Sequence, residues 1–381
     1  MVHKNYKIFI SVGEESADLH ASRLCEKLKK LYPEIELFGY GGGKMQAAGV
    51  EILFDLTKLA LIGFVEVIKH LPRIFRLEKL ALKIWEERKP DAILLVDYPG
   101  FHLRLARLAH EQGIPVLYYI SPQVWAWKEK RVELMRQVID RLYVIFPFEQ
   151  LFFERHQIRA TYVGHPLIER ITAVKHTPES IQEKLQNPVI GLMPGSRRNE
   201  FNQMLPVMMR AAHLLRKSIP HVRFIIPLAD TLPESVLNSF HIPEWIEVRR
   251  DQNYEVRRIF TLAWTKSGTS TVENALLGIP MAVVYRTGRI NMYLGRRFVR
   301  IPYIGMVNLI AQKGICPEFI QEQFQPRNLV RFTEEILCSP ARYQEMIEDL
   351  SKVREKMGHE PASERTAQEI LKFLQEQEQQ P

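Results

Sequence analysis

The chain has 381 residues, of which 46% are hydrophobic and 25% charged, and this composition excludes a disordered chain and predicts a globular protein of about two domains. The formal net charge of +8 suits nucleic acid, an anionic membrane or phosphorylated ligands and does not choose among them. Cys25, Cys316 and Cys338 lie far apart without a CxxC pair, which argues against a disulfide framework or a cysteine metal site.

The beginning of the sequence and its most hydrophobic stretch bear on where the protein is located. Polar residues 1–6 lead directly into a strand-like run over 7–12, so we expect no signal peptide and a cytoplasmic protein. The most hydrophobic stretch, 59–67, runs into Lys69 and His70, and it is shorter than the roughly 18 to 20 apolar residues of a membrane span. The sequence therefore predicts a protein that does not cross a membrane.

Short apolar runs alternate with longer amphipathic stretches along the whole chain. The first series of expected strands covers 7–12, 37–40, 92–97, 116–120 and 142–146, with helices such as 17–31 and 101–112 between them. The second series covers 189–193, 222–227, 246–249, 262–265 and 281–285. This alternation predicts an α/β protein with two Rossmann-like, doubly wound parallel-sheet domains.

A polar, proline-containing stretch over 173–188 separates the two series of strands. We expect a first domain over 1–168, a second over 169–340, and C-terminal helices over 341–381. These helices either cross back onto the first domain or exchange between the subunits of a homodimer, and both arrangements remain open. A hinge for domain closure is expected within residues 164–173.

Residues that follow strands carry most of the functional information, because ligands of open parallel sheets bind beyond the carboxyl ends of the strands. In the first domain these residues are 13–18 (GEESAD), the glycine turn 39–43 and Asp97. The first of them opens a helix with acidic residues that complement its dipole, and a simple capped helix start is the alternative. The glycine turn either admits a ligand or is only a turn. Asp97 is unusual because it places a carboxylate at the end of a buried apolar strand.

The second domain repeats an arrangement of strand, glycine turn, hydroxyl side chains and helix start. It occurs at 193–200 and again at 266–273, where backbone amides, hydroxyls and guanidiniums can hold phosphate oxygens. The candidate ligands of a pyrophosphate are Gly195, Ser196, Arg197, Glu200, Ser267, Gly268 and Thr269. Glu273 either accepts hydrogen bonds from ribose hydroxyls or serves as a structural capping-box carboxylate.

Motifs of other nucleotide-dependent enzymes are missing from the sequence. It has neither GxxxxGK[ST] nor the GxGxxG fingerprint, which argues against ATP and NAD. It also lacks a DxD pair, HExxH and a cysteine cluster, so we expect metal-free chemistry and no cofactor. The basic residues are scattered and match no nucleic-acid motif, so nucleic acid is not an expected partner.

Several short motifs occur in an order that is typical of one known family. They are GEESAD at 13–18, DYPGF at 97–101, SPQVWAW at 121–127, FPFE at 146–149, GHP at 164–166, PGSR at 194–197 with Glu200, SGT at 267–269 with Glu273, and NLIA at 308–311. Together they resemble the lipid-A-disaccharide synthase family over nearly the whole chain, from the first strand to about Gln325. The SPxVWAW segment is the most specific of these motifs.

The resemblance implies a GT-B glycosyltransferase, with the two doubly wound domains facing across a cleft. The implied reaction of lipid A biosynthesis in a Gram-negative bacterium moves 2,3-diacylglucosamine from its UDP carrier to the 6-hydroxyl of 2,3-diacylglucosamine 1-phosphate, with inversion. Its products are UDP and the β-1,6-linked disaccharide 1-phosphate of lipopolysaccharide. Such a displacement needs a base for the hydroxyl and stabilisation of the departing diphosphate.

The resemblance also assigns roles to individual residues. Asp97 is the base or orients the acceptor, and Glu14 and Ser16 belong to the catalytic group with it. The two loops of the second domain hold the UDP, and Asn308 completes the donor site.

At three positions the chain departs from the pattern of the family. Ala17 replaces a glycine, which matters only if that position requires a positive φ. Val307 replaces a proline, and His102 stands where an asparagine commonly follows the phenylalanine. His102 either assists proton transfer or only packs in the core.

An apolar stretch followed by basic residues is the expected contact with the membrane. Residues 59–68 are largely apolar and precede Lys69, His70, Arg73, Arg76, Lys79 and Lys83. The side chains expected to contact acyl chains or an anionic membrane are Leu61, Ile62, Phe64, Val65 and Ile68. This pattern predicts peripheral association with the inner membrane, and a core helix with a solvated basic flank is the alternative.

Some alternatives remain open at this point. Trp125 and Trp127 either line the acceptor cleft or close the core at the end of the sheet, and we expect one of them to have a structural role and the other to be exposed in the cleft. A UDP-sugar epimerase or a peptidoglycan-type glycosyltransferase of the same fold would also have paired diphosphate loops. A non-catalytic nucleotide-sugar-binding protein is a further class, and the intact Asp97 argues against it.

Overall fold

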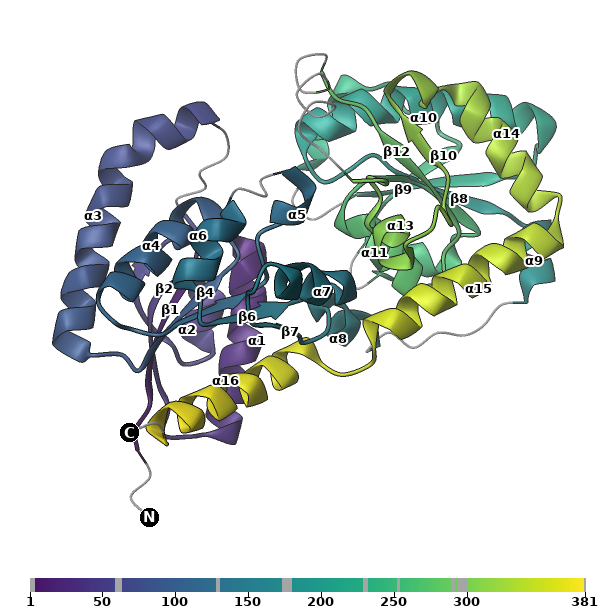
Figure 1. Cartoon of the computed structure of the whole chain (residues 1–381). Coiled ribbons are helices and arrows are strands. Elements are labelled where there is room, and N and C mark those ends of the chain that lie inside the picture. The colour runs from purple at the N-terminus through teal and green to yellow at the C-terminus, as the bar shows by residue number, and fades with distance from the viewer. Residues whose placement is uncertain are drawn as a thin grey trace. The chain divides into compact units, whose positions relative to one another are not determined.

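The computed structural model describes residues 4–58, 64–127, 131–172, 180–228, 232–251, 254–288, 292 and 301–379. The chain divides into two compact units, which are described separately (Figure 1). The first unit runs to Pro166 and takes up the chain again from His359, and the second comprises Leu167–Gly358.

The first unit is built on a seven-stranded parallel sheet in the order β3-β2-β1-β4-β5-β6-β7. Its strands are β1 (Lys7–Val12), β2 (Glu36–Gly41), β3 (Glu51–Asp55), β4 (Ala92–Val96), β5 (Val116–Tyr119), β6 (Arg141–Val144) and β7 (Ala160–Tyr162). The strand order reverses between β1 and β4, which pair in parallel with each other. Ligands of doubly wound sheets bind at such a reversal, beyond the carboxyl ends of the two strands.

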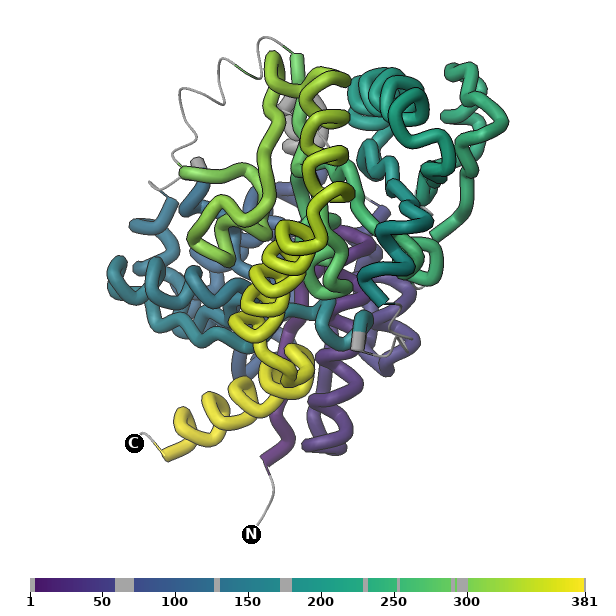
Figure 2. The backbone as a smooth tube through the Cα atoms, turned by 90° about the vertical axis from the view of Figure 1, so that its right-hand side faces the viewer, coloured from purple at the N-terminus to yellow at the C-terminus, as the bar shows by residue number. Residues whose placement is uncertain are grey.

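Helices cover the sheet of the first unit because their apolar side chains recur on one face. In α1 the buried face includes Ala21, Leu24 and Leu28. The helices are α1 (Glu15–Leu31), α2 (Gly43–Ala47), α3 (Phe64–Arg88), α4 (Pro99–Glu111), α5 (Val124–Trp127), α6 (Arg131–Val138), α7 (Pro147–Arg155) and α16 (Ala362–Glu378). Figure 2 shows α16 beside α1, and Lys27 of α1 forms an ion pair with Glu364 of α16 at 2.8 Å.

The second unit contains a six-stranded parallel sheet in the order β10-β9-β8-β11-β12-β13. Its strands are β8 (Val189–Met193), β9 (Arg223–Leu228), β10 (Ile246–Arg250), β11 (Leu262–Lys266), β12 (Met281–Tyr285) and β13 (Glu318–Ile320). Its α-helices are α8 (Pro166–Thr172), α9 (Ile181–Gln186), α10 (Arg198–Ser218), α11 (Thr269–Leu276), α13 (Met306–Ala311), α14 (Pro326–Leu337) and α15 (Pro340–Met357). Here the order reverses between β8 and β11.

The expected pair of doubly wound parallel-sheet domains is confirmed. Every strand expected from the sequence is present, and the sheets contain three further strands, β3, β7 and β13. All three are edge strands of three to five residues that are largely half-buried, so they lack the continuous apolar run of a central strand. Within the described ranges, no helix has the length and apolar character needed to cross a membrane.

Candidate functional site

Each sheet reverses its strand order at a pair of strands that the sequence also singles out. In the first unit, β1 leads into Glu14 and β4 leads into Asp97. In the second unit, β8 leads into the loop of Gly195, and β11 leads into the loop of Ser267 and Gly268. Glu14, Asp97 and the two glycine loops therefore lie beyond the carboxyl ends of the strands at which each sheet reverses, where ligands of doubly wound sheets bind.

The backbone turns sharply after β4. Asp97 and Tyr98 both have φ of +52°, a left-handed conformation that costs residues other than glycine about 1–3 kcal/mol each. The carbonyl oxygen of Asp97 accepts two hydrogen bonds, from the hydroxyl of Tyr118 at 2.6 Å and from Nδ1 of His102 at 2.6 Å. These contacts hold the turn in its unusual conformation.

The carboxyl group of Asp97 has a pKa that is raised from 3.8 to about 6. Burial is the largest cause, the negative charge of Glu14 acts in the same direction, and a hydrogen bond from the backbone amide of Tyr98 opposes the shift. The group is therefore largely ionised at neutral pH and still basic enough to accept a proton from a hydroxyl that is becoming a nucleophile.

His102 is fully buried beneath this turn. Burial lowers its pKa to about 4, so the imidazole is neutral at physiological pH. Because the Asp97 carbonyl can only accept, Nδ1 of His102 carries the proton, and Nε2 accepts from the hydroxyl of Ser11 at 2.9 Å. The imidazole thus connects β1 to the turn after β4.

The loops that follow β1 and β4 pack against each other, with the ring of Tyr98 lying on Gly13. A Cβ atom on Gly13 would lie 2.4 Å from the ring of Tyr98, so only glycine permits this contact. Glu14 caps α1 through its backbone alone, and Ser16 is exposed in the first turn of that helix. Ala17 lies buried inside the helix without a positive φ, so its departure from glycine causes no backbone strain.

Asp18 of the GEESAD motif has a structural role. Its carboxylate accepts hydrogen bonds from the backbone amides of Gly42 at 2.9 Å, Lys44 at 3.0 Å and Met45 at 3.3 Å. It thereby fixes the glycine turn after β2 against the start of α1.

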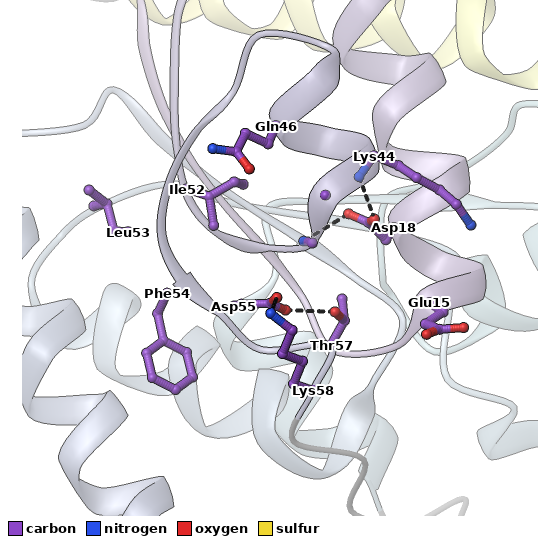
Figure 3. A pocket seen from close by; sticks show the side chains of 12 residues that line it. Glu15, Asp18, Lys44, Gln46, Ile52, Leu53, Phe54, Asp55, Thr57 and Lys58 are labelled. Carbon is purple, nitrogen blue, oxygen red and sulfur yellow. Dashed lines mark hydrogen bonds and ion pairs between the residues drawn. The ribbon is translucent and has the colours of Figure 1, made fainter.

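A pocket of about 760 Å³ opens beside this turn (Figure 3). Its lining comes from the start of α1, the glycine turn and β3, and comprises Glu15, Asp18, Gly42, Gly43, Lys44, Gln46, Ile52, Leu53, Phe54, Asp55, Thr57 and Lys58. Figure 3 shows the apolar side chains of Ile52, Leu53 and Phe54 on one side, and charged residues, including Lys44 and Glu15, on the other. The pocket has the size and the mixed lining of a small-molecule site.

In the second unit, Glu200 and Lys266 link the two glycine loops. Nζ of Lys266, the last residue of β11, lies 2.9 Å from Oε1 of Glu200 in the first turn of α10. Gly195 has φ of +119°, and a Cβ atom there would lie 2.6 Å from Oε2 of Glu200. Arg197 is the N-cap residue of α10, and its guanidinium, 77% exposed, lies 3.8 Å from Oε1 of Glu200. The ion pair places a cation directly between the two loops.

A side-chain hydrogen bond to Ile304 and a glycine N-cap define the conformation of the loop after β11. The hydroxyl of Ser267 donates to the carbonyl of Ile304 at 2.6 Å, and Gly268, with φ of +145°, is the N-cap of α11. Thr269 is the exposed first residue of that helix. The amide groups at the start of α11 therefore point beyond the sheet, as an anion site requires.

Glu273 lies farther along α11 and is already paired. Its carboxylate accepts from Nη1 of Arg257 at 2.6 Å and from the hydroxyl of Tyr254 at 3.0 Å. Arg257 also binds Asp251. Because Gly268 is the N-cap, the capping-box alternative for Glu273 is wrong.

Asn308 is fully buried inside the second unit. Its amide nitrogen donates to the carbonyl of Cys316 at 2.8 Å and to Glu318 at 2.8 Å, and its oxygen accepts from the amide of Cys316. Glu318 in turn accepts from the backbone amides of Ile304 and Gly305 at 2.9 Å. Asn308 is thereby connected through Glu318 to the loop of Ile304 and Gly305, and the carbonyl of Ile304 accepts the hydroxyl of Ser267.

Some predicted residues lie outside what the structure describes. Leu61 and Ile62 fall outside the described residues altogether. Phe64, Val65 and Ile68 belong to α3, but their side chains, like that of Trp127, are also outside the described part. The choice between a membrane contact and a core helix therefore stays a prediction.

Sequence reasoning missed two residues that organise these sites. Lys266 was detectable, because it ends a strand and directly precedes Ser267. Glu149 was hidden in the FPFE motif, although its buried carboxylate accepts hydrogen bonds from Ser121 and from the indole of Trp125. Trp125 thereby has a structural role.

Comparisons with known proteins agree with the resemblance seen in the sequence. A family model described as lipid-A-disaccharide synthetase matches residues 8–373. The lipid-A-disaccharide synthase of Geobacter metallireducens is 36% identical over 375 residues, which cover 97% of this chain and 98% of that protein. That of Nitrosococcus oceani is 37% identical over 378 residues and 97% of each chain.

Solved structures share the fold at low sequence identity. A putative UDP-N-acetylglucosamine 2-epimerase from Listeria monocytogenes aligns with a TM-score of 0.67, 14% identity and 98% coverage of both chains. The UDP-GlcNAc 2-epimerase from Neisseria meningitidis, bound to UDP-GlcNAc, aligns with a TM-score of 0.65 and 15% identity over 96% of this chain and 100% of that one. The calicheamicin glycosyltransferase CalG4 aligns with a TM-score of 0.63 and 15% identity over 98% and 99%.

Proposed function

The chain belongs to the lipid-A-disaccharide synthase family and is a glycosyltransferase, and from this premise we propose how its own residues perform the reaction. The 2,3-diacylglucosamine unit of a UDP-linked donor passes to the 6-hydroxyl of 2,3-diacylglucosamine 1-phosphate, with inversion at the anomeric carbon. The products are the β-1,6-linked lipid A disaccharide 1-phosphate and UDP. Epimerases share the fold at 14–15% identity, whereas full-length relatives at 36–37% are synthases, so the epimerase alternative is not favoured.

The observation that carries the mechanism is the state of Asp97. Its carboxyl group, with a pKa of about 6, stands on a fixed turn at the strand reversal of the first unit. It takes the proton from the acceptor hydroxyl as that oxygen attacks the donor sugar. Burial keeps the pKa of Asp97 raised, the charge of Glu14 adds to this effect, and the exposed Ser16 offers a hydroxyl for orienting the acceptor.

The donor's diphosphate binds at the strand reversal of the second unit. Arg197, Lys266 and the amides at the start of α10 and α11 supply positive charge and donors to the phosphate oxygens. The same groups stabilise the negative charge that develops on UDP as it leaves. Two hydroxyls, of Ser196 and Thr269, are further donors to the phosphate oxygens. The carboxylate of Glu273 accepts hydrogen bonds from the ribose hydroxyls.

The acceptor's sugar lies in the pocket beside the glycine turn. An amphiphilic acceptor matches a lining that is apolar along β3 and charged around Lys44 and Glu15. The chain leaves this pocket through Lys58 and enters the segment 59–68, which we propose rests on the anionic surface of the inner membrane. The enzyme would then act as a peripheral protein at the cytoplasmic side of that membrane.

Incubation of the purified protein with both substrates and a chelator tests this proposal. We expect the disaccharide and UDP to form in equal amounts, because no step requires a metal ion. The D97N variant should lose turnover by roughly 10²- to 10⁴-fold while binding UDP with unchanged affinity. If folded wild-type protein releases UDP without forming the disaccharide, or forms neither, the proposed reaction is wrong.

A further inference from the structure

We propose that His102 is a positioning residue, which sets the direction of the Asp97 carboxylate by holding the backbone beneath it. This inference rests on the proposed function, because it assumes that Asp97 is the base. His102 itself is fully buried and does not reach substrate, so it acts only through Asp97.

The conformation of Asp97 is one that its own backbone does not favour. Asp97 and Tyr98 are consecutive residues with a left-handed φ, and an aspartate released from such a turn would relax toward an ordinary strand or helix geometry. The direction of its carboxylate would then change. Whatever holds the turn therefore decides whether the base faces its substrate.

Two donors converge on the single carbonyl oxygen of Asp97. The Tyr118 hydroxyl comes from β5, and Nδ1 of His102 comes from the first turn of α4, each at 2.6 Å. His102 is held in turn by the hydroxyl of Ser11 at 2.9 Å, and β1 carries this serine at a fully buried position. The turn is thus attached to β1, β5 and α4 at once.

Two aromatic rings pack edge to face against the imidazole. Its ring centroid lies 5.7 Å from that of Tyr98 and 6.4 Å from that of Tyr118, with both pairs close to perpendicular. Since Ser11 can donate only to an unprotonated Nε2, the ring presents its N–H to Asp97. Both the tautomer and the orientation are therefore fixed before substrate binds.

Asparagine offers a conservative replacement. Its side-chain amide N–H can replace the N–H of Nδ1 as the donor to the Asp97 carbonyl, which alanine cannot do. Comparison of H102N with H102A therefore distinguishes the effect of losing the hydrogen bond to Asp97 from the effect of losing side-chain volume.

Steady-state kinetics of these variants, with saturating donor and varied acceptor, test the proposal. We expect H102A to lower kcat by about ten- to hundredfold, with the KM for acceptor and the affinity for UDP changed less than about twofold. H102N should recover most of that loss. The H110A variant removes an exposed histidine from the last turn of the same helix and should behave as wild type.

The Y118F variant keeps the test decisive if H102A fails to fold. It is nearly isosteric and removes only the second hydrogen bond to Asp97, so it should lower kcat in the same direction with a melting temperature close to wild type. Unchanged kcat in folded Y118F and H102A would overturn the proposal, as would a loss that merely follows the fraction of folded protein. Failure of the proposed function is distinguishable, because wild type would then form no disaccharide.

Discussion

At the scale of single residues, the pair Glu14 and Asp97 makes the pH dependence of the enzyme predictable. The base works only when ionised, so kcat/KM should fall as the pH drops through about 6, the pKa of Asp97. Because Glu14 contributes to that raised value by charge repulsion, E14Q should move this acid limb to lower pH. A pH–rate profile of both proteins, with the D97N background as control for residual activity, measures the shift.

An acid limb at the same pH in E14Q would contradict this effect of Glu14 on Asp97. Glu14 would then act on substrate instead of on Asp97. A loss of activity at all pH values, with the limb unmoved, would lead to the same conclusion.

Lys266 allows a second prediction at this scale. It is the cation that joins the two phosphate loops through Glu200, so K266M should raise the Kd for UDP about tenfold or more, since charge-assisted hydrogen bonds contribute roughly 1.5–3 kcal/mol. K266R should retain most of the affinity because it keeps the charge. Calorimetric titration with UDP measures both variants. Equal weakening by K266R and K266M would indicate that the loop geometry, and not the cation, binds the diphosphate.

At the scale of elements, one buried carboxylate connects two motifs. Oε1 of Glu149 accepts from Ser121 and Trp125, and Oε2 accepts from the backbone amides of Ile145 and Phe146. The segment that contains α5 is thereby fixed to the start of α7. Burial is the largest cause that raises the pKa of Glu149, from 4.5 to about 7, against these four hydrogen bonds.

This shift makes the stability of the first unit depend on pH. The pKa of Glu149 is higher in the folded than in the unfolded protein. The contribution of this carboxyl group to the free energy of unfolding is therefore complete below pH 4.5 and is lost as the pH rises to about 7. E149Q cannot ionise, and its amide cannot accept hydrogen bonds from both Ile145 and Phe146, so its free energy of unfolding should be lower than that of wild type. This difference, the stability margin, should shrink as the pH rises, because only wild type loses stability. Between pH 4.5 and pH 7 the margin should decrease by about 3 kcal/mol.

Urea unfolding at a series of pH values between 4.5 and 8 measures this margin. E133Q is a suitable control, because Glu133 is an exposed carboxylate of the same unit and pairs locally with Arg136 and Gln137. A margin between E149Q and wild type that stays constant with pH would show that Glu149 is ionised throughout.

The strands and the contacts between them differ in how well the sequence predicts them. Central strands were predictable because both of their faces are buried, which requires a continuous apolar run, whereas the half-buried edge strand β3 leaves no such pattern. Asp97 was predictable from its place after a strand. Its connection to Ser11 was not, because 91 residues separate Ser11 from His102 and only the pairing of β1 with β4 brings them together.

At the scale of the whole molecule, the two units divide the chemistry between them. In the proposed mechanism the first unit supplies the base Asp97, after β4, and an acceptor pocket beside β2 and β3, and the second unit supplies the two glycine loops that bind the diphosphate. Acceptor and donor affinity should therefore be separable by mutation. A substitution that fills the pocket of the first unit should weaken the acceptor and leave UDP binding intact.

Gly43 is the position at which this separation can be tested. It lines the pocket, has no positive φ, and a Cβ atom there would meet nothing within 4 Å, so G43F can project into the open space without strain. We expect the KM for the acceptor to rise about tenfold, as the ring takes the volume of a sugar, with an unchanged Kd for UDP. G288F places the same ring in open space in the second unit and is the matched control. An unchanged KM in G43F would mean that the acceptor binds elsewhere, and a raised Kd for UDP would assign the pocket to the donor.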